Sequence, residues 1–334
     1  MSFRGYGNGQ EFTVQGYVFR GMALPSQSTK RKSLKNLIQL IKMFVVRTVA
    51  EAEVRLEAGG QVHRQKTNQA GFFEFKVQNP GWPDGWHRAA IRLESHLVEG
   101  QETVAVPAEI RICSAPQRVV VSDIDDTLLV SHITKIWRKI YLLVSRNPQS
   151  RKPFKGVAEF YRQLHQQTQQ PFYYVSSSEW NLYDFLTAFM QFHALPKGVL
   201  QLKDLKTSWK DFFKSSLQSH SHKRDKIERL LQVHHPAQFI LIGDNGQQDP
   251  YLYRQLAELY PEQIEGVLIR KISHAKAAET EALLATLNQF GIPFCLFNDS
   301  AEAEHFCREK GWLKWGGGRR EREVDSPQTT VHRP

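Results

Sequence analysis

Short apolar runs alternate with polar, turn-rich segments along the first third of the chain. The pattern predicts strands at Glu11 to Phe19, Ala52 to Leu56, Phe72 to Val77, Trp86 to Leu93 and Thr103 to Ile112. Glycine, asparagine and proline residues separate these runs, as at 68–71 and 80–85. Several short strands divided by such turns are typical of a β-sandwich. We therefore expect a β-sandwich-like domain over residues 1–115.

One segment inside this half has a helical pattern instead. Between Lys30 and Arg47, apolar residues recur at three- and four-residue spacing, and lysines such as Lys35 and Lys42 lie between them. This pattern predicts an amphipathic helix with a basic polar face over residues 30–47. Two interpretations stay open: the apolar face packs on the sandwich, or the helix lies on an anionic membrane surface.

Strands and helices alternate after residue 116. The strands are expected at Val119 to Ser122, Phe172 to Val175, Phe239 to Ile242, Val267 to Arg270 and Phe294 to Phe297. Helical apolar spacing fills the segments between them, which predicts an α/β domain with a Rossmann-like parallel sheet over residues 116–312. Residues 128–155 are too long for a turn and are basic and partly apolar, so we expect a small helical cap there. The polar, glycine-rich residues 313–334 predict a disordered tail.

Composition adds an anionic partner to this picture. The 334 residues carry a formal charge of +10, which favours a membrane surface, a nucleic acid or a phosphorylated substrate as partner. The three cysteines are few, odd in number and far apart, which indicates a reducing compartment rather than a disulfide or zinc framework. No apolar run is long enough to cross a bilayer, and no signal peptide is evident. We expect a cytoplasmic protein, peripheral at a membrane if residues 30–47 dock there.

Polar side chains gather where three of the predicted parallel strands end. The first group is Asp123-Ile124-Asp125-Asp126-Thr127, the second is Ser176-Ser177-Ser178, and the third runs from Gly243-Asp244 to Asp249. Because parallel strands present their carboxyl ends at one edge of a sheet, these groups are expected to share a site. Clustered carboxylates repel each other, so a fold tolerates them when a cation or a reaction needs them. The alternative for the first group alone is a turn and a helix cap.

In this order, with His222-Lys223 opening a helix before the third strand, the motifs resemble the haloacid-dehalogenase superfamily of phosphotransferases. More narrowly, they resemble the catalytic domain of actin-patch-type phosphatidate phosphatases, closely over about residues 116–270. The resemblance implies a magnesium-dependent phosphatase that works through a covalent aspartyl-phosphate. It also implies phosphatidate as the substrate and diacylglycerol as the product.

The resemblance assigns catalytic roles to the first acidic group. Asp123 would be the nucleophile, and Asp125 would protonate the leaving alkoxide and then deprotonate the attacking water. The alternatives for Asp125 are a metal ligand or a helix cap. Thr127 would orient the loop.

Hydroxyls and a lysine would hold the phosphoryl group. Ser176 would donate a hydrogen bond to a phosphoryl oxygen, with Ser177 and Ser178 as further substrate-binding candidates. Lys223 would neutralise the phosphoryl charge, and Lys226 is a rival on the same helix.

The resemblance also implies an Mg²⁺ site. Asp123, the Asp125 carbonyl and Asp244 would ligate the metal, since a hard cation prefers oxygen ligands. Asp249 is a further candidate ligand, but it precedes Pro250, so it could instead cap a helix that begins with proline.

Two other functions remain open. A phosphatase of soluble or nucleic-acid phosphomonoesters would share every catalytic residue, and a non-catalytic membrane- or partner-binding module would need none of them. We expect a phosphorylated lipid as the substrate and no nucleic-acid partner. The sequence departs from the family pattern at Glu179, where proline is usual, and at Asn245, where serine is common. These two positions bear on the substrate and remove no catalytic group.

Overall fold

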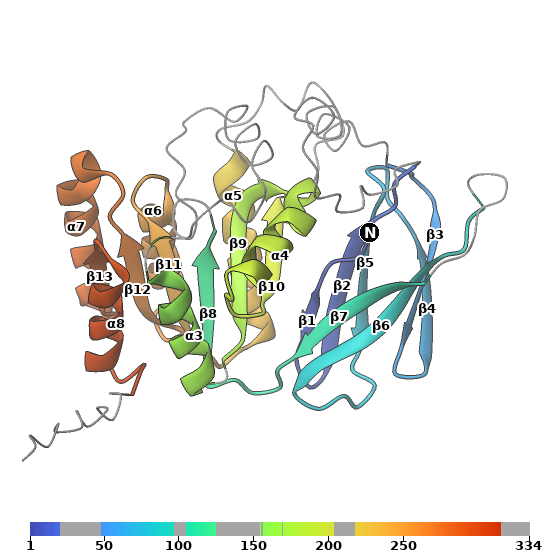
Figure 1. The fold of residues 1–334 in the computed structure, drawn as a ribbon, viewed down its shortest axis with the longest axis horizontal. Helices are drawn as coiled ribbons and strands as arrows, with labels where there is room; N and C mark the ends of the chain where they lie inside the picture. Colours follow the sequence, from blue (N-terminus) through green and yellow to red (C-terminus); the bar gives the residue numbers. More distant parts are fainter. Residues whose placement is uncertain are drawn as a thin grey trace, which may run out of the picture.

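The computed structural model describes residues 1–20, 48–96, 105–124, 154, 156–168, 170–203 and 218–314 (Figure 1). The amphipathic helix expected at 30–47, all but Phe154 of the cap expected at 128–155 and most of the expected tail lie outside these residues. Two sheets dominate the described part of the chain. None of its helices combines the length and apolar character needed to cross a membrane.

The first sheet has seven strands and curls around one core. Its strands are β1 (Gly5–Gly7), β2 (Glu11–Tyr17), β3 (Glu53–Ala58), β4 (Gln61–Lys66), β5 (Phe72–Gln78), β6 (Gly85–Leu93) and β7 (Val106–Ile112). They pair in the order β4-β3-β6-β7-β1-β2-β5, and of these pairs β1–β7 is parallel and the others are antiparallel. Leu56, near one edge of this order, and Phe75, at the other edge, lie in the same buried cluster.

The expected β-sandwich is not confirmed, because these seven strands form one barrel-like sheet rather than two packed sheets. Alternation along a strand predicts which side chains face inward, as at Val54 and Leu56 in β3. It does not predict which strands pair, and pairing alone separates a sandwich from a curled sheet.

The second sheet has six strands, and all of its pairs are parallel. Its strands are β8 (Arg118–Asp123), β9 (Phe172–Glu179), β10 (Val199–Lys203), β11 (Gln238–Asp244), β12 (Ile264–Arg270) and β13 (Phe294–Phe297), in the order β10-β9-β8-β11-β12-β13. The central strands β8 and β11 are buried at every residue after the first, as continuous apolar runs such as Val119 to Val121 predict. The predicted α/β domain with a parallel sheet is confirmed.

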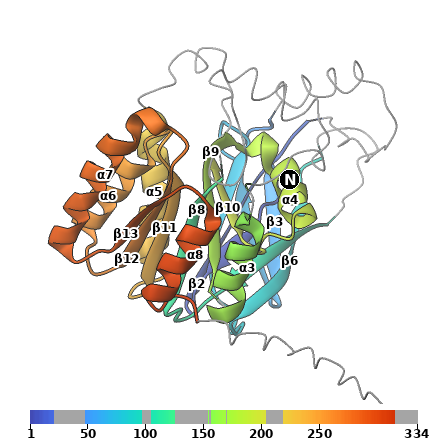
Figure 2. The ribbon, with the colours of Figure 1, turned by 60° about the vertical axis from the view of Figure 1, so that its left-hand side comes forward.

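Helices cover both faces of this sheet. They are α3 (Val157–Thr168), α4 (Tyr183–Phe192), α5 (Gln218–Val233), α6 (Asp249–Leu259), α7 (Ala277–Ala285) and α8 (Ser300–Glu309), with short 3₁₀ turns at Trp180–Leu182, His274–Lys276 and Thr286–Phe290. Figure 2 shows α3 and α8 on one face and α5, α6 and α7 on the other, and the buried residues divide into two clusters accordingly. At the start of α8, Asp299 caps the helix by accepting hydrogen bonds from the Ala301 and Glu302 amides.

The two halves share their hydrophobic cores. Phe3 stacks on Trp180 with the ring centroids 3.8 Å apart, and Tyr6 meets Tyr173 edge to face at 5.6 Å. Phe3 belongs to the cluster under α3, α4 and α8, while Tyr6 belongs to the cluster under α5 and α6. Burial of such large aromatic groups stabilises the docking of the two sheets.

Candidate active site

The site begins at the point where the order of the six-stranded sheet reverses. The chain runs outward from β8 to β10 on one side and from β11 to β13 on the other, so β8 and β11 are neighbours although over a hundred residues separate them. Ligands of such sheets bind beyond the carboxyl ends of the strands at this point. Asp123 ends β8, Asp244 ends β11, and both are almost fully buried. The sheet therefore brings together two of the predicted carboxylates.

Asp249 joins them from the first residue of α6. Its Oδ2 accepts a hydrogen bond from the Asp244 amide at 3.3 Å. Gly243 makes this approach possible, because a Cβ at that position would lie 2.5 Å from Asp249 Oδ2. The residue that precedes the helix is Gln248, so the alternative assignment of Asp249 as the helix cap is wrong. Its carboxylate points back into the cluster.

One oxygen from each of Asp123, Asp244 and Asp249 lies within 4.8 Å of the others. Asp244 Oδ1 also accepts hydrogen bonds from the Gly246 and Gln247 amides at 2.7 and 3.2 Å, which fixes that carboxylate. Three buried carboxylates offer only oxygen donors, the set that Mg²⁺ prefers. The residues present therefore fit a hard divalent cation.

Lys223, on α5, binds two of these three carboxylates. Its ammonium donates to Asp123 Oδ1 at 2.8 Å and also to Asp249 Oδ1. Burial alone would lower the pKa of Lys223, but Asp123 and Asp249 outweigh it and hold the pKa well above the ordinary value. The side chain is therefore a fixed positive charge beside Asp123. Lys226, the rival candidate, makes neither of these two contacts among those described.

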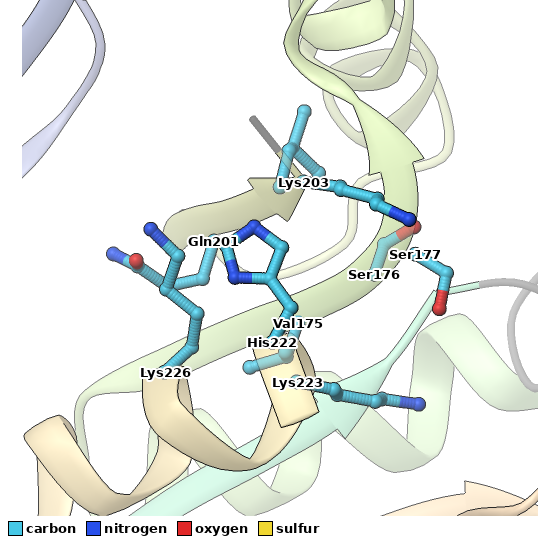
Figure 3. Close-up of a pocket in the computed structure, with 9 residues that line it drawn as sticks. Val175, Ser176, Ser177, Gln201, Lys203, His222, Lys223 and Lys226 are labelled. Carbon is cyan, nitrogen blue, oxygen red and sulfur yellow. The ribbon is translucent and has the colours of Figure 1, made fainter. Parts of the chain in front are cut away.

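The three serines end β9 next to this cluster. Ser176 is 4% exposed, and its hydroxyl accepts a hydrogen bond from the Ser178 amide at 2.9 Å, near the end of β9. Figure 3 shows a small recess lined by Ser176, Ser177 and Lys223, in which the ends of these three side chains point toward the same side. Hydroxyls and an ammonium that converge in this way suit the oxygens of a phosphoryl group.

Lys203 and His222 also line this recess, and the sequence pattern did not assign either of them to the site. Lys203 ends β10, and His222 and Lys226 come from the first turns of α5. Figure 3 shows all three around the recess. Lys203 could have been found only if β10 had been predicted, because its place at the end of a parallel strand is the signal. His222 was seen only as a part of the helix start.

Asn245 ties the loop after Asp244 to the loop after β12. Its side-chain oxygen accepts hydrogen bonds from the Ile272 and Ser273 amides, both at 2.8 Å, and its amide donates to the Ser273 carbonyl at 2.8 Å. This residue is 1% exposed. The departure from serine at this position therefore supplies three hydrogen bonds that hold the Asp244 loop in place.

Asp125 and Thr127 lie outside the described residues. Ser122, just before the nucleophile candidate, is described: its hydroxyl lies 2.8 Å from the Tyr161 hydroxyl, and burial raises the pKa of Tyr161. The structure thus describes seven of the nine candidate site residues and brings Asp123, Asp244, Asp249 and Lys223 into one contact network. Ser176 and Ser177 line the adjoining recess.

The fold and this network define an α/β domain with a cluster of three buried carboxylates beside a lysine and the serines near the end of β9, an arrangement suited to phosphate esters. Residues 118–271, which carry all these groups, match the family described as "Phosphatidate phosphatase APP1, catalytic domain". This part of the chain is therefore similar to that family of phosphatase catalytic domains.

Two curated proteins are similar to the chain. An uncharacterised protein of Schizosaccharomyces pombe is 23% identical over 250 residues, which is 74% of this chain and 40% of that protein. Phosphatidate phosphatase APP1 of Saccharomyces cerevisiae is 28% identical over 156 residues, which is 46% of this chain and 26% of that protein. The chain thus spans less than half the length of each relative.

Solved structures resemble the chain only weakly. A chain of the Pnkp1/Rnl/Hen1 complex matches with a TM-score of 0.31 and 13% identity, covering 61% of this chain and 57% of that one. A carbohydrate acetylesterase from Xanthomonas citri matches with a TM-score of 0.30 and 10% identity, covering 91% of this chain and 72% of that one. Such scores support no conclusion about fold or function.

Proposed function

We propose that the chain is a magnesium-dependent phosphatase of the haloacid-dehalogenase type that hydrolyses a phosphomonoester through an aspartyl-phosphate on Asp123. The observation that carries the proposal is the ammonium of Lys223 bound to both Asp123 and Asp249 inside a cluster of three buried carboxylates. A structural ion pair needs one carboxylate. Three carboxylates with one lysine leave an excess of negative charge, which a divalent metal would compensate.

In the first half of the reaction, an oxygen of Asp123 attacks the phosphorus and the bond to the leaving oxygen breaks. Lys223 lies 2.8 Å from Asp123 Oδ1, so it offsets the repulsion between the carboxylate and the anionic phosphoryl group. Ser176 and Ser177, which line the adjoining recess, would hold the phosphoryl oxygens. The leaving alkoxide takes a proton from Asp125, a role that rests on the sequence resemblance.

In the second half, Asp125 accepts a proton from water as the water oxygen attacks the phosphorus. The bond between phosphorus and the Asp123 oxygen breaks, inorganic phosphate leaves and the carboxylate is restored. Asp123, Asp244 and Asp249 would hold Mg²⁺, which supplies charge neutralisation to the phosphoryl oxygens when bound. Asp244 is kept in place by two backbone amides and by the Asn245 cross-link.

The proposed substrate is phosphatidate, with diacylglycerol as the product. Support comes from the catalytic-domain match over residues 118–271 and from the similarity to yeast phosphatidate phosphatase APP1. An anionic membrane surface, approached through residues 30–47, remains part of this proposal. The chain's charge of +10 favours such a surface, since each basic residue near an anionic bilayer is worth about 1 kcal/mol.

The deciding experiment compares phosphate release from phosphatidate vesicles with release from soluble phosphomonoesters, with Mg²⁺ and with a chelator. Asp123→Asn should abolish release, because an amide is not a competent nucleophile. Asp225→Asn is the matched control, since Asp225 is an exposed acid on α5. Inactivity of the wild-type chain on every phosphomonoester would overturn the phosphatase proposal. Activity confined to soluble substrates would overturn only the lipid part.

A further inference from the structure

The helix that carries Lys223 is held by both halves of the protein. Figure 1 shows α5 (yellow) on the six-stranded sheet, where it packs beside α6. Arg229 on α5 also binds Glu74 on β5 of the seven-stranded sheet. The matched catalytic family covers residues 118–271 only, so β5 lies outside it. The contacts between α5 and the seven-stranded sheet therefore connect the matched catalytic region to residues outside it.

Two stripes of residues run along α5. Lys223, Ile227, Leu230 and Leu231 recur at the spacing of one helix face, and all four are buried. Lys226, Arg229 and Val233 form a second stripe at the same spacing. Arg229 forks onto Glu74 of β5, with distances of 2.9 and 2.5 Å to its two carboxylate oxygens. The side-chain amide of Asn8 donates a hydrogen bond to the Val233 carbonyl oxygen at 2.9 Å.

The two stripes constrain the helix in different ways. The apolar contacts of Ile227, Leu230 and Leu231 are non-directional, so they hold α5 against the sheet but fix its rotation only weakly. A bidentate arginine–carboxylate pair has a defined plane and direction. Arg229 lies six residues after Lys223, about 9 Å along the helix axis. A rotation permitted at Arg229 would therefore move the ammonium of Lys223 relative to Asp123.

The Glu74 end of the pair is itself fixed. Gln15, its register partner on β2, donates a hydrogen bond to the Glu74 carboxylate. Burial works to raise the pKa of Glu74, but the hydrogen bonds from Arg229 and Gln15 outweigh it and hold the pKa below its usual value. The pKa of Arg229 is raised in turn, chiefly by its hydrogen bond to Glu74. Both partners thus stay charged over the physiological range.

We propose that the Glu74–Arg229 pair is a positioning device for Lys223, which makes the seven-stranded sheet a working part of the active site. The expected effect on catalysis rests on the proposed function. The expected effect on the orientation of α5 rests only on the contacts described above. Glu74 and Arg229 touch neither the carboxylate cluster nor the recess, so they act through the orientation of α5.

The test compares variants of this pair with a matched pair elsewhere in the interface. Glu109 on β7 joins Lys197, just before β10, at 2.7 Å, and thus also links the two sheets, but it does not touch α5. Glu74→Gln and Arg229→Gln should each lower kcat about tenfold and change KM less than about twofold, because a misplaced catalytic group costs rate at constant binding. Arg229→Lys should recover most of the loss. Glu109→Gln should leave kcat within about twofold of wild type.

Two further readouts separate positioning from general damage. The double variant Glu74→Gln/Arg229→Gln should be no slower than either single variant, because both remove one interaction. Hydrogen exchange of the α5 amides should be about tenfold faster in Glu74→Gln than in Glu109→Gln. Equal kinetic losses in both interface variants, or α5 protection unchanged by Glu74→Gln, would overturn the proposal. Exchange needs no turnover, so it still decides the positioning if the wild-type chain releases no phosphate, a result that would sink only the proposed function.

Discussion

Lys223 Nζ lies 2.8 Å from Asp123 Oδ1, although 100 residues separate the two in the chain. The same ammonium binds Asp249, and all three side chains are buried. Removing one member of a buried ionic network leaves the others uncompensated, which is costly. Each member of this network can therefore be tested by a single substitution.

Lys223→Met should lower phosphate release at least about 100-fold, the usual cost of losing one electrostatic contact to a reacting group. Asp123 and Asp249 would then lose the lysine ammonium that binds both of them, so the free energy of unfolding should also fall. The raised pKa means that Lys223 is fully charged below its ordinary pKa and loses charge only in strongly alkaline solution. Lys223 should thus add no limb to the pH–rate profile near neutrality.

Lys226→Met is the control, since Lys226 lies three residues further along α5 and lines the recess instead. Its effect on release should stay below about tenfold. An equal loss in the two variants, measured as initial rates at saturating substrate, would contradict the distinct role of Lys223.

Mg²⁺ should stabilise the folded chain. A ligand present at a hundred times its Kd adds about 2.7 kcal/mol to the free energy of unfolding, so Tm should rise as Mg²⁺ is titrated in and should return when a chelator is added. Asp244→Asn should remove most of this shift, because Asp244 belongs to the three-carboxylate cluster. Asp225→Asn should keep it. Differential scanning calorimetry measures both, and a shift that survives in Asp244→Asn would place the cation elsewhere.

Gly243→Ala should impair the cluster through sterics alone. The added Cβ would lie 2.5 Å from Asp249 Oδ2 and 2.9 Å from the Tyr253 ring, so Asp249 must move. We expect a loss of about 1–3 kcal/mol in stability together with a weaker Mg²⁺-dependent Tm shift. Gly311→Ala is the comparison, because Gly311 has a φ of 71° and no atom within 4 Å of its added Cβ. Backbone strain there should lower Tm but leave the Mg²⁺ shift unchanged.

Stability should fall in mild acid because of His234. This side chain is buried, its Nε2 lies 2.5 Å from the Tyr173 hydroxyl, and burial lowers its pKa from 6.5 to about 4. In mild acid, His234 therefore binds a proton in the unfolded chain but stays neutral in the folded chain. The contribution is fully present above pH 6.5 and is lost as the pH falls toward 4, by up to about 3 kcal/mol.

Urea unfolding of wild type and His234→Gln between pH 7 and pH 4 measures this contribution. The difference in unfolding free energy between the two should shrink or change sign over that range. His274→Gln, at an exposed position, serves as the control and should track wild type. Parallel curves for wild type and His234→Gln would refute the assignment.

The sequence predicted the parallel sheet and the meeting of Asp123 with Asp244, because each carboxylate comes just after a short apolar run that indicates a buried strand. Lys223 could be placed on a helix, but its contact with Asp249 depends on the packing of α5 beside α6, which periodicity does not specify. The close approach of Gly243 to Asp249 could not be predicted either, because a sequence pattern gives no distances across a turn.

Three strands escaped prediction for identifiable reasons. Gly5–Gly7 is too short and glycine-rich, and Gln61–Lys66 is polar and mostly exposed at a sheet edge, with only Val62 as a large apolar residue. Val199–Lys203 does contain apolar residues, but Gln201 interrupts them, and that residue is 2% exposed. Pairing partners, rather than local pattern, make these segments strands.

The stacking of Phe3 on Trp180 also has a consequence for synthesis on the ribosome. A growing chain exposes its N-terminal residues first, yet Phe3 and Tyr17 find their cluster only after α3, β9 and α4 have been made. The last strand of the seven-stranded sheet ends at Ile112, so this sheet must keep an apolar surface uncovered until Trp180 has been translated. During that interval the nascent chain is a natural client for chaperones, and its exposure ends when the second sheet closes over it.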